Sequence, residues 1–166
     1  MQAFYSEAIL ISKQSVEIVR RFHPPGESPD LVPGMREFVK RVGPDFQREA
    51  VLAYYAHDPF LQHIHPDIEW DASFGGLSAV ARGARELAMW MSDWMEMWQS
   101  YVHCVVEYRD LGDWVLVPVD VRARGLTGVP VEMRVFEIFQ VRDGKVAVFR
   151  SFRTEQKALE AAGLSE

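Results

Sequence analysis

The sequence contains a single cysteine, Cys104, among its 166 residues. An internal disulfide is therefore excluded, and the composition suits a reducing compartment. No apolar run approaches the roughly 20 residues that a membrane-spanning helix needs. The first residues also lack the basic region and the small-residue cleavage site of a signal peptide. From these features we expect a soluble, cytoplasmic protein without membrane contacts.

The sequence also has fewer basic than acidic residues. Lysine and arginine number 18 against 24 acidic residues, which gives a net charge of −6 and argues against nucleic-acid partners. The sequence has no glycine-rich phosphate loop, no CxxC motif and no recognisable Ser-His-Asp order, so we expect no cofactor. His57, His63 and His65 cluster in the sequence, but no carboxylate or cysteine at a ligand spacing completes a metal site, so we expect no metal.

The composition is otherwise that of an ordinary globular domain, with 48% apolar and 25% charged residues,. Hydrophobic periodicity and turn residues predict a helical first part, a strand-rich second part and a final helix. We predict helices over 4–22, 35–42, 46–56, 60–64 and 83–100, and strands over 68–72, 101–109, 114–125, 129–141 and 145–153.

Two glycine-containing turns set the expected strand register. The turn from Gly125 to Gly128 makes Asp120 face Arg134 and Arg122 face Glu132, so that opposite charges line one sheet face. By the same count, the turn at 142–144 places Glu137 opposite Phe149.

Glu137 is the residue that most directly suggests a site. It shares the parity of the apolar side chains in the segment 129–141, so it projects from the apolar face of the predicted strand. A carboxylate there must be paired, must be neutral or must line a cavity.

The face occupied by His103 depends on the turn at 110–113. A three-residue turn places His103 on the same face as Glu137, whereas a four-residue turn places Cys104 and Val106 there. The second arrangement matches the apolar surface better, and we favour it.

Four short motifs resemble the SnoaL-like group of the nuclear transport factor 2 superfamily. They are HPDIEW at 65–70, RGARE at 82–86, VRDGKV at 141–146 and ALEAAGL at 158–164. The resemblance covers about 46–164. We therefore expect an N-terminal helical extension of unknown role at 1–43 and a SnoaL-like domain at 44–166.

The resemblance implies an α+β, cone-shaped fold in which a curved antiparallel sheet wraps around N-terminal helices and encloses an apolar pocket. It places Glu137 where ketosteroid isomerases carry the neutral carboxylic acid of their oxyanion hole. The catalytic base of those enzymes falls on Ala72 and not on the neighbouring Asp71, which counts against isomerase chemistry. The residues expected to line the pocket are Tyr54, Tyr55, Trp70, Trp94, Trp98, Val119, Val135, Phe139 and Phe149.

The superfamily does not fix one function. We expect a protein that binds a small apolar or aromatic molecule in its pocket. One alternative is a cofactor-free isomerase, cyclase, dehydratase or hydrolase that uses Glu137 as acid or base. Another is a non-catalytic dimerisation or interaction module. The resemblance also implies a homodimer formed through the open face of the sheet.

Overall fold

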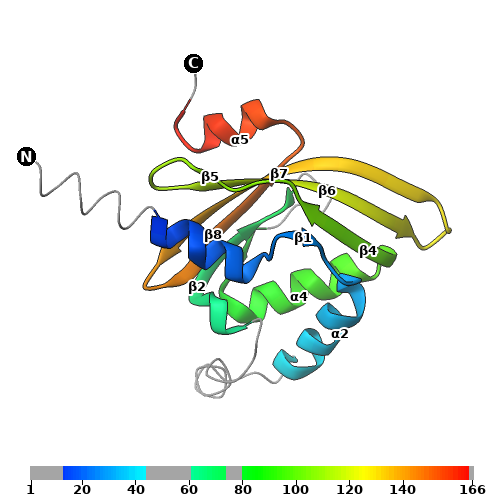
Figure 1. Cartoon of the computed structure of the whole chain (residues 1–166). Coiled ribbons are helices and arrows are strands. Elements are labelled where there is room, and N and C mark those ends of the chain that lie inside the picture. The colour runs from blue at the N-terminus through cyan, green and yellow to red at the C-terminus, as the bar shows by residue number, and fades with distance from the viewer. Residues whose placement is uncertain (1–12, 44–60, 74–79, 165–166) are drawn as a thin grey trace, which may run out of the picture.

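An eight-stranded, mostly antiparallel sheet dominates the computed structural model, which describes residues 13–43, 61–73 and 80–164 (Figure 1). Seven strands follow the order β1-β4-β6-β7-β8-β2-β3, and β5 pairs with β6. The strands are β1 (Gly26–Glu27), β2 (Ile64–Asp71), β3 (Ala81–Arg82), β4 (Trp98–Val105), β5 (Arg109–Asp110), β6 (Val115–Gly125), β7 (Pro130–Arg142) and β8 (Lys145–Phe152).

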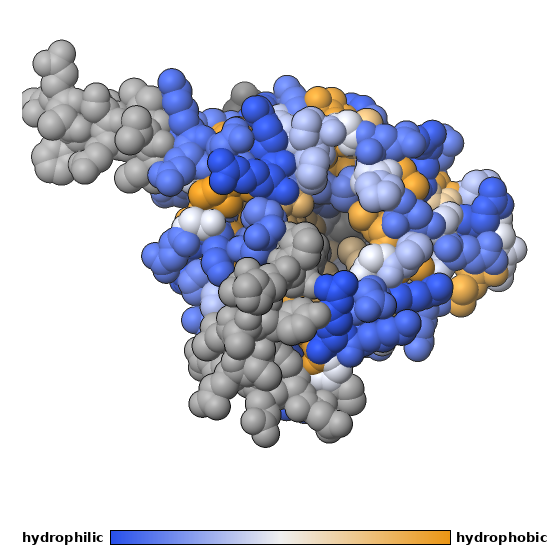
Figure 2. Space-filling model, turned by 60° about the horizontal axis from the view of Figure 1, so that its bottom comes forward, coloured by the Kyte–Doolittle hydropathy of each residue, from blue (hydrophilic) through white to orange (hydrophobic). Residues whose placement is uncertain are grey.

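The helices lie on both sides of this curved sheet (Figure 1). Residues 13–22 are helical, and α2 (Leu31–Val42) and α4 (Gly83–Met95) lie together on the concave side. The short helix α5 (Glu155–Ala161) covers part of the opposite side. No helix in the described ranges is both long and apolar enough to cross a membrane. On the face shown in Figure 2, the coloured residues are mostly hydrophilic, with smaller hydrophobic patches between them. The expected α+β cone is therefore confirmed, except that β2 and β8 pair in parallel.

The helix expected at 35–42 begins four residues earlier, at Leu31. Asp30 is its N-cap, and the Asp30 carboxylate accepts a hydrogen bond from the backbone N–H of Val32 at 3.0 Å,. Pro33 does not prevent this start, because proline is tolerated in the first turn of a helix.

The helix expected to run to residue 100 ends instead at Met95, and Trp98 begins β4. Pairing with β6 from Trp98 onward satisfies the backbone groups of this segment. Tertiary pairing thus overrides the helical spacing of the aromatic residues. Similarly, the helix expected at 60–64 is a single 3-10 turn, η1 (Leu61–His63), and β2 starts at Ile64. The helix expected at 46–56 lies outside the described residues.

The register of the first hairpin is confirmed: Asp120 pairs with Arg134 and Arg122 with Glu132. Two hydrogen bonds of 2.6 and 2.8 Å join Arg134 to Asp120 on the exposed face. The side chain of Arg122, however, binds Glu27 of β1.

The register of the second hairpin differs from the prediction. Asp143 and Gly144 both have positive φ and form a two-residue turn,. Next to this turn, the register of the pairing between β7 and β8 shifts between Gln140 and Val141,. As a result Glu137 pairs with Ser151, while Phe149 pairs with Phe139. The shift is by two residues, so each side chain keeps its expected face.

Candidate functional site

A cavity of about 280 Å³ lies between the concave side of the sheet, α4 and the segment that precedes α2. Its size is close to the lower limit for small-molecule sites. Its wall is mostly apolar and strongly aromatic. It consists of Phe22, His23, Pro24, Pro25, Glu27, Ser28, Pro29, Leu31, Met35, Trp70, Ala72, Trp90, Trp94, Trp98, Tyr101, His103, Met133, Glu137, Phe149 and Ser151.

The structure brings some of the predicted site residues together and leaves others apart. The cavity wall includes Glu137, Trp70, Trp94, Trp98 and Phe149. The rings of Trp70 and Phe149 stack with centroids 3.8 Å apart. Another three of the predicted residues pack in the buried core: Val119, Val135 and Phe139. The last two, Tyr54 and Tyr55, lie outside the described residues.

Glu137 combines two of the three situations that its sequence position allowed, because it lines the cavity and also contacts the imidazole of His23. Its Oε2 lies 3.1 Å from Nε2 of His23, and the two side chains are only 14% and 7% exposed. The distance alone would allow a hydrogen bond, but Nε2 of His23 makes none in the described part of the chain. We therefore describe a close ion-pair contact whose hydrogen-bond geometry is incomplete.

His103 faces the cavity together with Glu137, so the preference for Cys104 and Val106 on this face was wrong. Val106 lies beyond the end of β4 and is exposed. The His103 ring meets the His23 ring edge to face, with centroids 4.0 Å apart. Burial, followed by repulsion from His23, lowers the pKa of His103 to about 3,. His103 is therefore a neutral imidazole near pH 7.

Tyr101 adds a phenol to the same wall. Burial and the negative charge of Glu137 raise the pKa of this hydroxyl above its ordinary value,. The phenol thus stays protonated and can donate a hydrogen bond across the physiological pH range.

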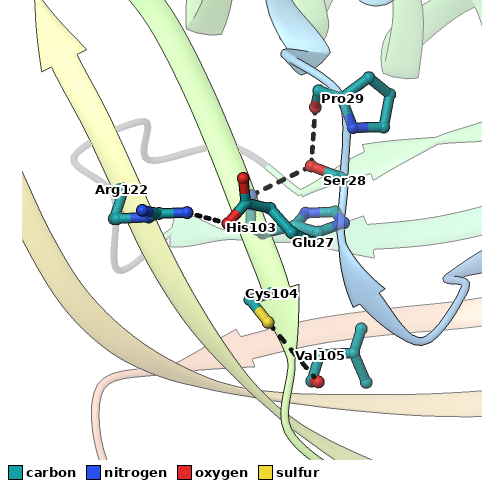
Figure 3. Close-up of polar contacts among 7 residues, drawn as sticks. All are labelled: Glu27, Ser28, Pro29, His103, Cys104, Val105 and Arg122. Carbon is teal, nitrogen blue, oxygen red and sulfur yellow. Dashed lines mark hydrogen bonds and ion pairs between the residues drawn. The ribbon is translucent and has the colours of Figure 1, made fainter.

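The segment between the first helix and α2 is fastened to the sheet: Figure 3 shows the bond of Ser28 to His103 of β4 and that of Glu27 to Arg122 of β6. Residues of β1 pair with Cys104 and Val105. The backbone N–H of Ser28 donates to the carbonyl oxygen of His103, and the Ser28 hydroxyl accepts from the backbone N–H of His103 at 3.1 Å. These contacts hold one side of the cavity in place.

Three further hydrogen bonds anchor the ends of this segment. The Tyr108 hydroxyl donates to the backbone oxygen of His23 at 2.5 Å. Oδ1 of Asp30 accepts from the backbone N–H groups of both Val32 and Tyr101, each at 3.0 Å. These bonds hold the backbone of His23 and the start of α2 against the rest of the molecule.

Buried polar atoms without a hydrogen-bond partner concentrate in the cavity wall. Among the described residues six such side-chain atoms occur, and five belong to wall residues: His23, Trp70, Trp90, Trp98 and Ser151. Buried polar side-chain atoms normally have a hydrogen-bond partner. The wall therefore has spare capacity for hydrogen bonds to a bound molecule.

The sequence reasoning missed His23 and the residues that follow it. The motif His23-Pro24-Pro25-Gly26 directly follows the helix predicted over 4–22, and its pattern indicates only that this helix ends there,. Nothing in the local pattern shows that a segment more than 100 residues before Glu137 will contact it. An available signal was that a buried carboxylate needs a partner.

The model of the SnoaL-like domain family matches residues 45–149, so the chain belongs to this family. Solved structures with the same fold agree. The structure of TerC with polyporic acid is 22% identical with a TM-score of 0.53, and the match covers 70% of this chain and 95% of TerC. An NTF2-like protein of Burkholderia thailandensis is 26% identical with a TM-score of 0.50, covering 72% and 97%.

A third similar structure is a protein of Catenulispora acidiphila with a ketosteroid isomerase-like fold, in complex with trimethylamine. It is 14% identical with a TM-score of 0.50, and the match covers 70% of this chain and 93% of that one. A comparison with curated proteins finds no match. The chain is thus a SnoaL-like protein with a largely apolar pocket large enough for a small organic molecule.

Proposed function

We propose that the cavity binds a planar, largely apolar organic molecule that carries at least one oxygen atom. The main support is the composition of the wall, in which stacked aromatic rings are combined with unpaired donors. Flat indole and phenyl surfaces favour a flat ligand, and the donors favour an oxygen acceptor. That similar proteins were crystallised with polyporic acid or trimethylamine accords with a small ligand.

The proposal is tested with 2-naphthol, a flat fused-ring alcohol, and with decahydro-2-naphthol, its saturated and non-planar counterpart. Four of the five tryptophans line the cavity, and the fifth, Trp114, packs in a separate cluster with α5. A Trp114→Phe variant therefore removes background fluorescence without touching the cavity wall. We expect saturable quenching by 2-naphthol. Decahydro-2-naphthol has no aromatic chromophore, so its binding is measured by displacement of 2-naphthol, and we expect it to displace 2-naphthol poorly. Effective displacement by decahydro-2-naphthol at concentrations equal to that of 2-naphthol, or no quenching by 2-naphthol, would contradict the proposal.

A second candidate function is cofactor-free acid–base catalysis with Glu137 as the group that accepts or donates a proton. The contact between Glu137 and His23 in the cavity wall favours it, because paired titratable groups in a cavity are typical of such sites. The test is solvent exchange: a deuterium label next to the carbonyl of 2-tetralone, a fused-ring ketone, should wash out faster with the wild type than with Glu137→Gln. Equal rates would leave binding as the function.

We also propose a homodimer through the exposed face of β6 and β7. The support is that opposite charges, such as Asp120 and Arg134, already neutralise one another on this face. A neutralised surface costs less to desolvate than isolated charges. Light scattering at micromolar concentration should give about twice the mass of one chain, 19.0 kDa. A single-chain mass would contradict the dimer.

A further inference from the structure

Almost half of the cavity wall comes from residues that precede the SnoaL-like match. That match begins at residue 45, and nine of the twenty wall residues lie between Phe22 and Met35. Residues 22–35 of the expected N-terminal extension therefore form part of the cavity wall.

We infer that residues 22–35 form a functional part of the binding site, in which His23 is the positioning residue for the carboxylate of Glu137. This inference rests on the proposed function and adds which residues make the site select one ligand over another. With Glu137 held by His23, the free carboxylate oxygen can accept a hydrogen bond from a hydroxyl group on the ligand. The ligand class is accordingly a planar molecule with a phenol-like or enol-like hydroxyl.

The geometry supports a role beyond packing. A buried carboxylate next to a buried imidazole is expensive, and apolar residues of similar volume are often at least as stable. The contact is 3.1 Å long but lacks hydrogen-bond geometry, so it does not fully compensate for that cost. A small rotation of either side chain, when a ligand arrives, would complete the bond.

Among the described wall residues, His23 is the close partner of Glu137. His103 touches the His23 ring and stays neutral near pH 7. Tyr101 is a protonated phenol. Glu27 also lines the cavity, but its carboxylate binds Arg122 on β6. Of these wall residues, His23 is the one whose side chain makes an ion-pair contact with Glu137.

The segment is also built to stay in place. Three prolines, Pro24, Pro25 and Pro29, restrict its backbone,. Bonds from Tyr108 to His23 and between Ser28 and His103 fasten it to the β4 side of the sheet. A fixed segment pre-organises the carboxylate, which reduces the entropy lost on binding.

The experiment compares two probes that differ by one hydrogen-bond donor: 2-naphthol and 2-methoxynaphthalene. Their affinities are measured by tryptophan quenching for the wild type, His23→Phe and His23→Gln. Phenylalanine keeps an aromatic ring but has no donor. Glutamine places an amide N–H near the position of Nε2. The matched controls, His63→Phe and His63→Gln, alter a histidine of η1 outside the cavity wall.

We expect the wild type to prefer 2-naphthol by about tenfold, which is the effect of one hydrogen bond to a charged group. His23→Phe should abolish this preference while keeping the affinity for 2-methoxynaphthalene, and His23→Gln should restore most of it. A preference unchanged in His23→Phe would overturn the inference. So would an equal loss for both probes, because that is the signature of a wall that only packs.

A second measurement needs no ligand. Urea unfolding of His23→Phe, Glu137→Gln and the double variant tests whether the two residues interact in solution. Strictly additive losses would overturn the inference even if the probes bind. A different outcome is that His23 and Glu137 interact but the wild type binds neither probe. That result would overturn the proposed function and the positioning role, and the two residues would then be a structural pair.

Discussion

Ser151 stands directly opposite Glu137 in the pairing of β7 with β8, and both residues line the cavity. Its hydroxyl is buried and has no hydrogen-bond partner among the described residues. Across-strand neighbours on one face lie close together. The cavity therefore has a carboxylate and an unengaged hydroxyl side by side, close to where the ring of His23 approaches.

Replacing Ser151 by alanine should leave stability nearly unchanged, because the variant loses no formed hydrogen bond and no longer buries an unpaired group. Replacing Ser28 by alanine should instead cost about 1 kcal/mol of unfolding free energy, since its hydroxyl bonds the backbone of both His103 and Pro29,. Urea unfolding measures both. A Ser151→Ala loss as large as that of Ser28→Ala would show that the Ser151 hydroxyl has a partner in solution.

Glu137→Gln should preserve the fold, because glutamine has nearly the same shape and can still contact His23. We expect its affinity for 2-naphthol to fall about tenfold, as the charged acceptor is replaced by a neutral one. The matched control is Glu132→Gln on the exposed face of the same strand, β7, which should bind like the wild type. Circular dichroism checks the fold, and tryptophan quenching measures the affinity.

Most of the fold could be predicted from the sequence, because alternate residues of a strand point to the same face of the sheet. The alternation of residues along β7 placed Glu137 on the concave face, and the two-residue shift in the second hairpin did not alter that face,. The turn at Gly125 likewise fixed the pairing of Asp120 with Arg134. Patterns that depend on local geometry transfer from sequence to structure.

The partners of the site could not be predicted in this way. His23 meets Glu137 only because β1 pairs with β4, and no local pattern encodes that long-range contact. The predicted end of α4 was wrong for the same reason, because Trp98 pairs with β6 in the sheet although its spacing in the sequence is helical. Long-range pairing decided what local patterns left open.

His103 predicts a specific acid sensitivity. Its pKa is about 3 in the folded protein against an ordinary value of 6.5. Between these two pH values His103 is protonated in the unfolded chain but neutral in the folded protein. The stabilisation is fully present above pH 6.5 and is lost as the pH falls toward 3. Between pH 7 and 4.5 this residue alone should remove about 2 kcal/mol of unfolding free energy.

The measurement compares urea unfolding of the wild type and His103→Gln at both pH values, so that changes from the carboxylates common to both cancel. His63→Gln is the control at a half-buried histidine outside the cavity wall, whose pKa burial also lowers. We expect the wild type to lose more stability than His103→Gln on acidification. Parallel losses would show that His103 takes up a proton in the folded state.

Asp30 links the segment around His23 to the rest of the molecule through a single oxygen atom. Its Oδ1 caps α2 through Val32 and also accepts from the backbone N–H of Tyr101 on β4. Asp30→Ala should cost about 2–3 kcal/mol of unfolding free energy, because it removes a helix cap and leaves a half-buried N–H unpaired. Asp30→Asn keeps an acceptor oxygen and should lose less than half as much.

The affinity for a ligand should also fall more in Asp30→Ala than in Asp30→Asn, because the Asp30 carboxylate holds α2 and the wall residues before it. We expect Asp30→Ala to weaken 2-naphthol and 2-methoxynaphthalene by the same factor, because it loosens the wall without changing the contact between His23 and Glu137. Urea unfolding and tryptophan quenching on the same samples test both expectations. A selective loss of 2-naphthol in Asp30→Ala would mean that Asp30 acts on the carboxylate and not on the wall.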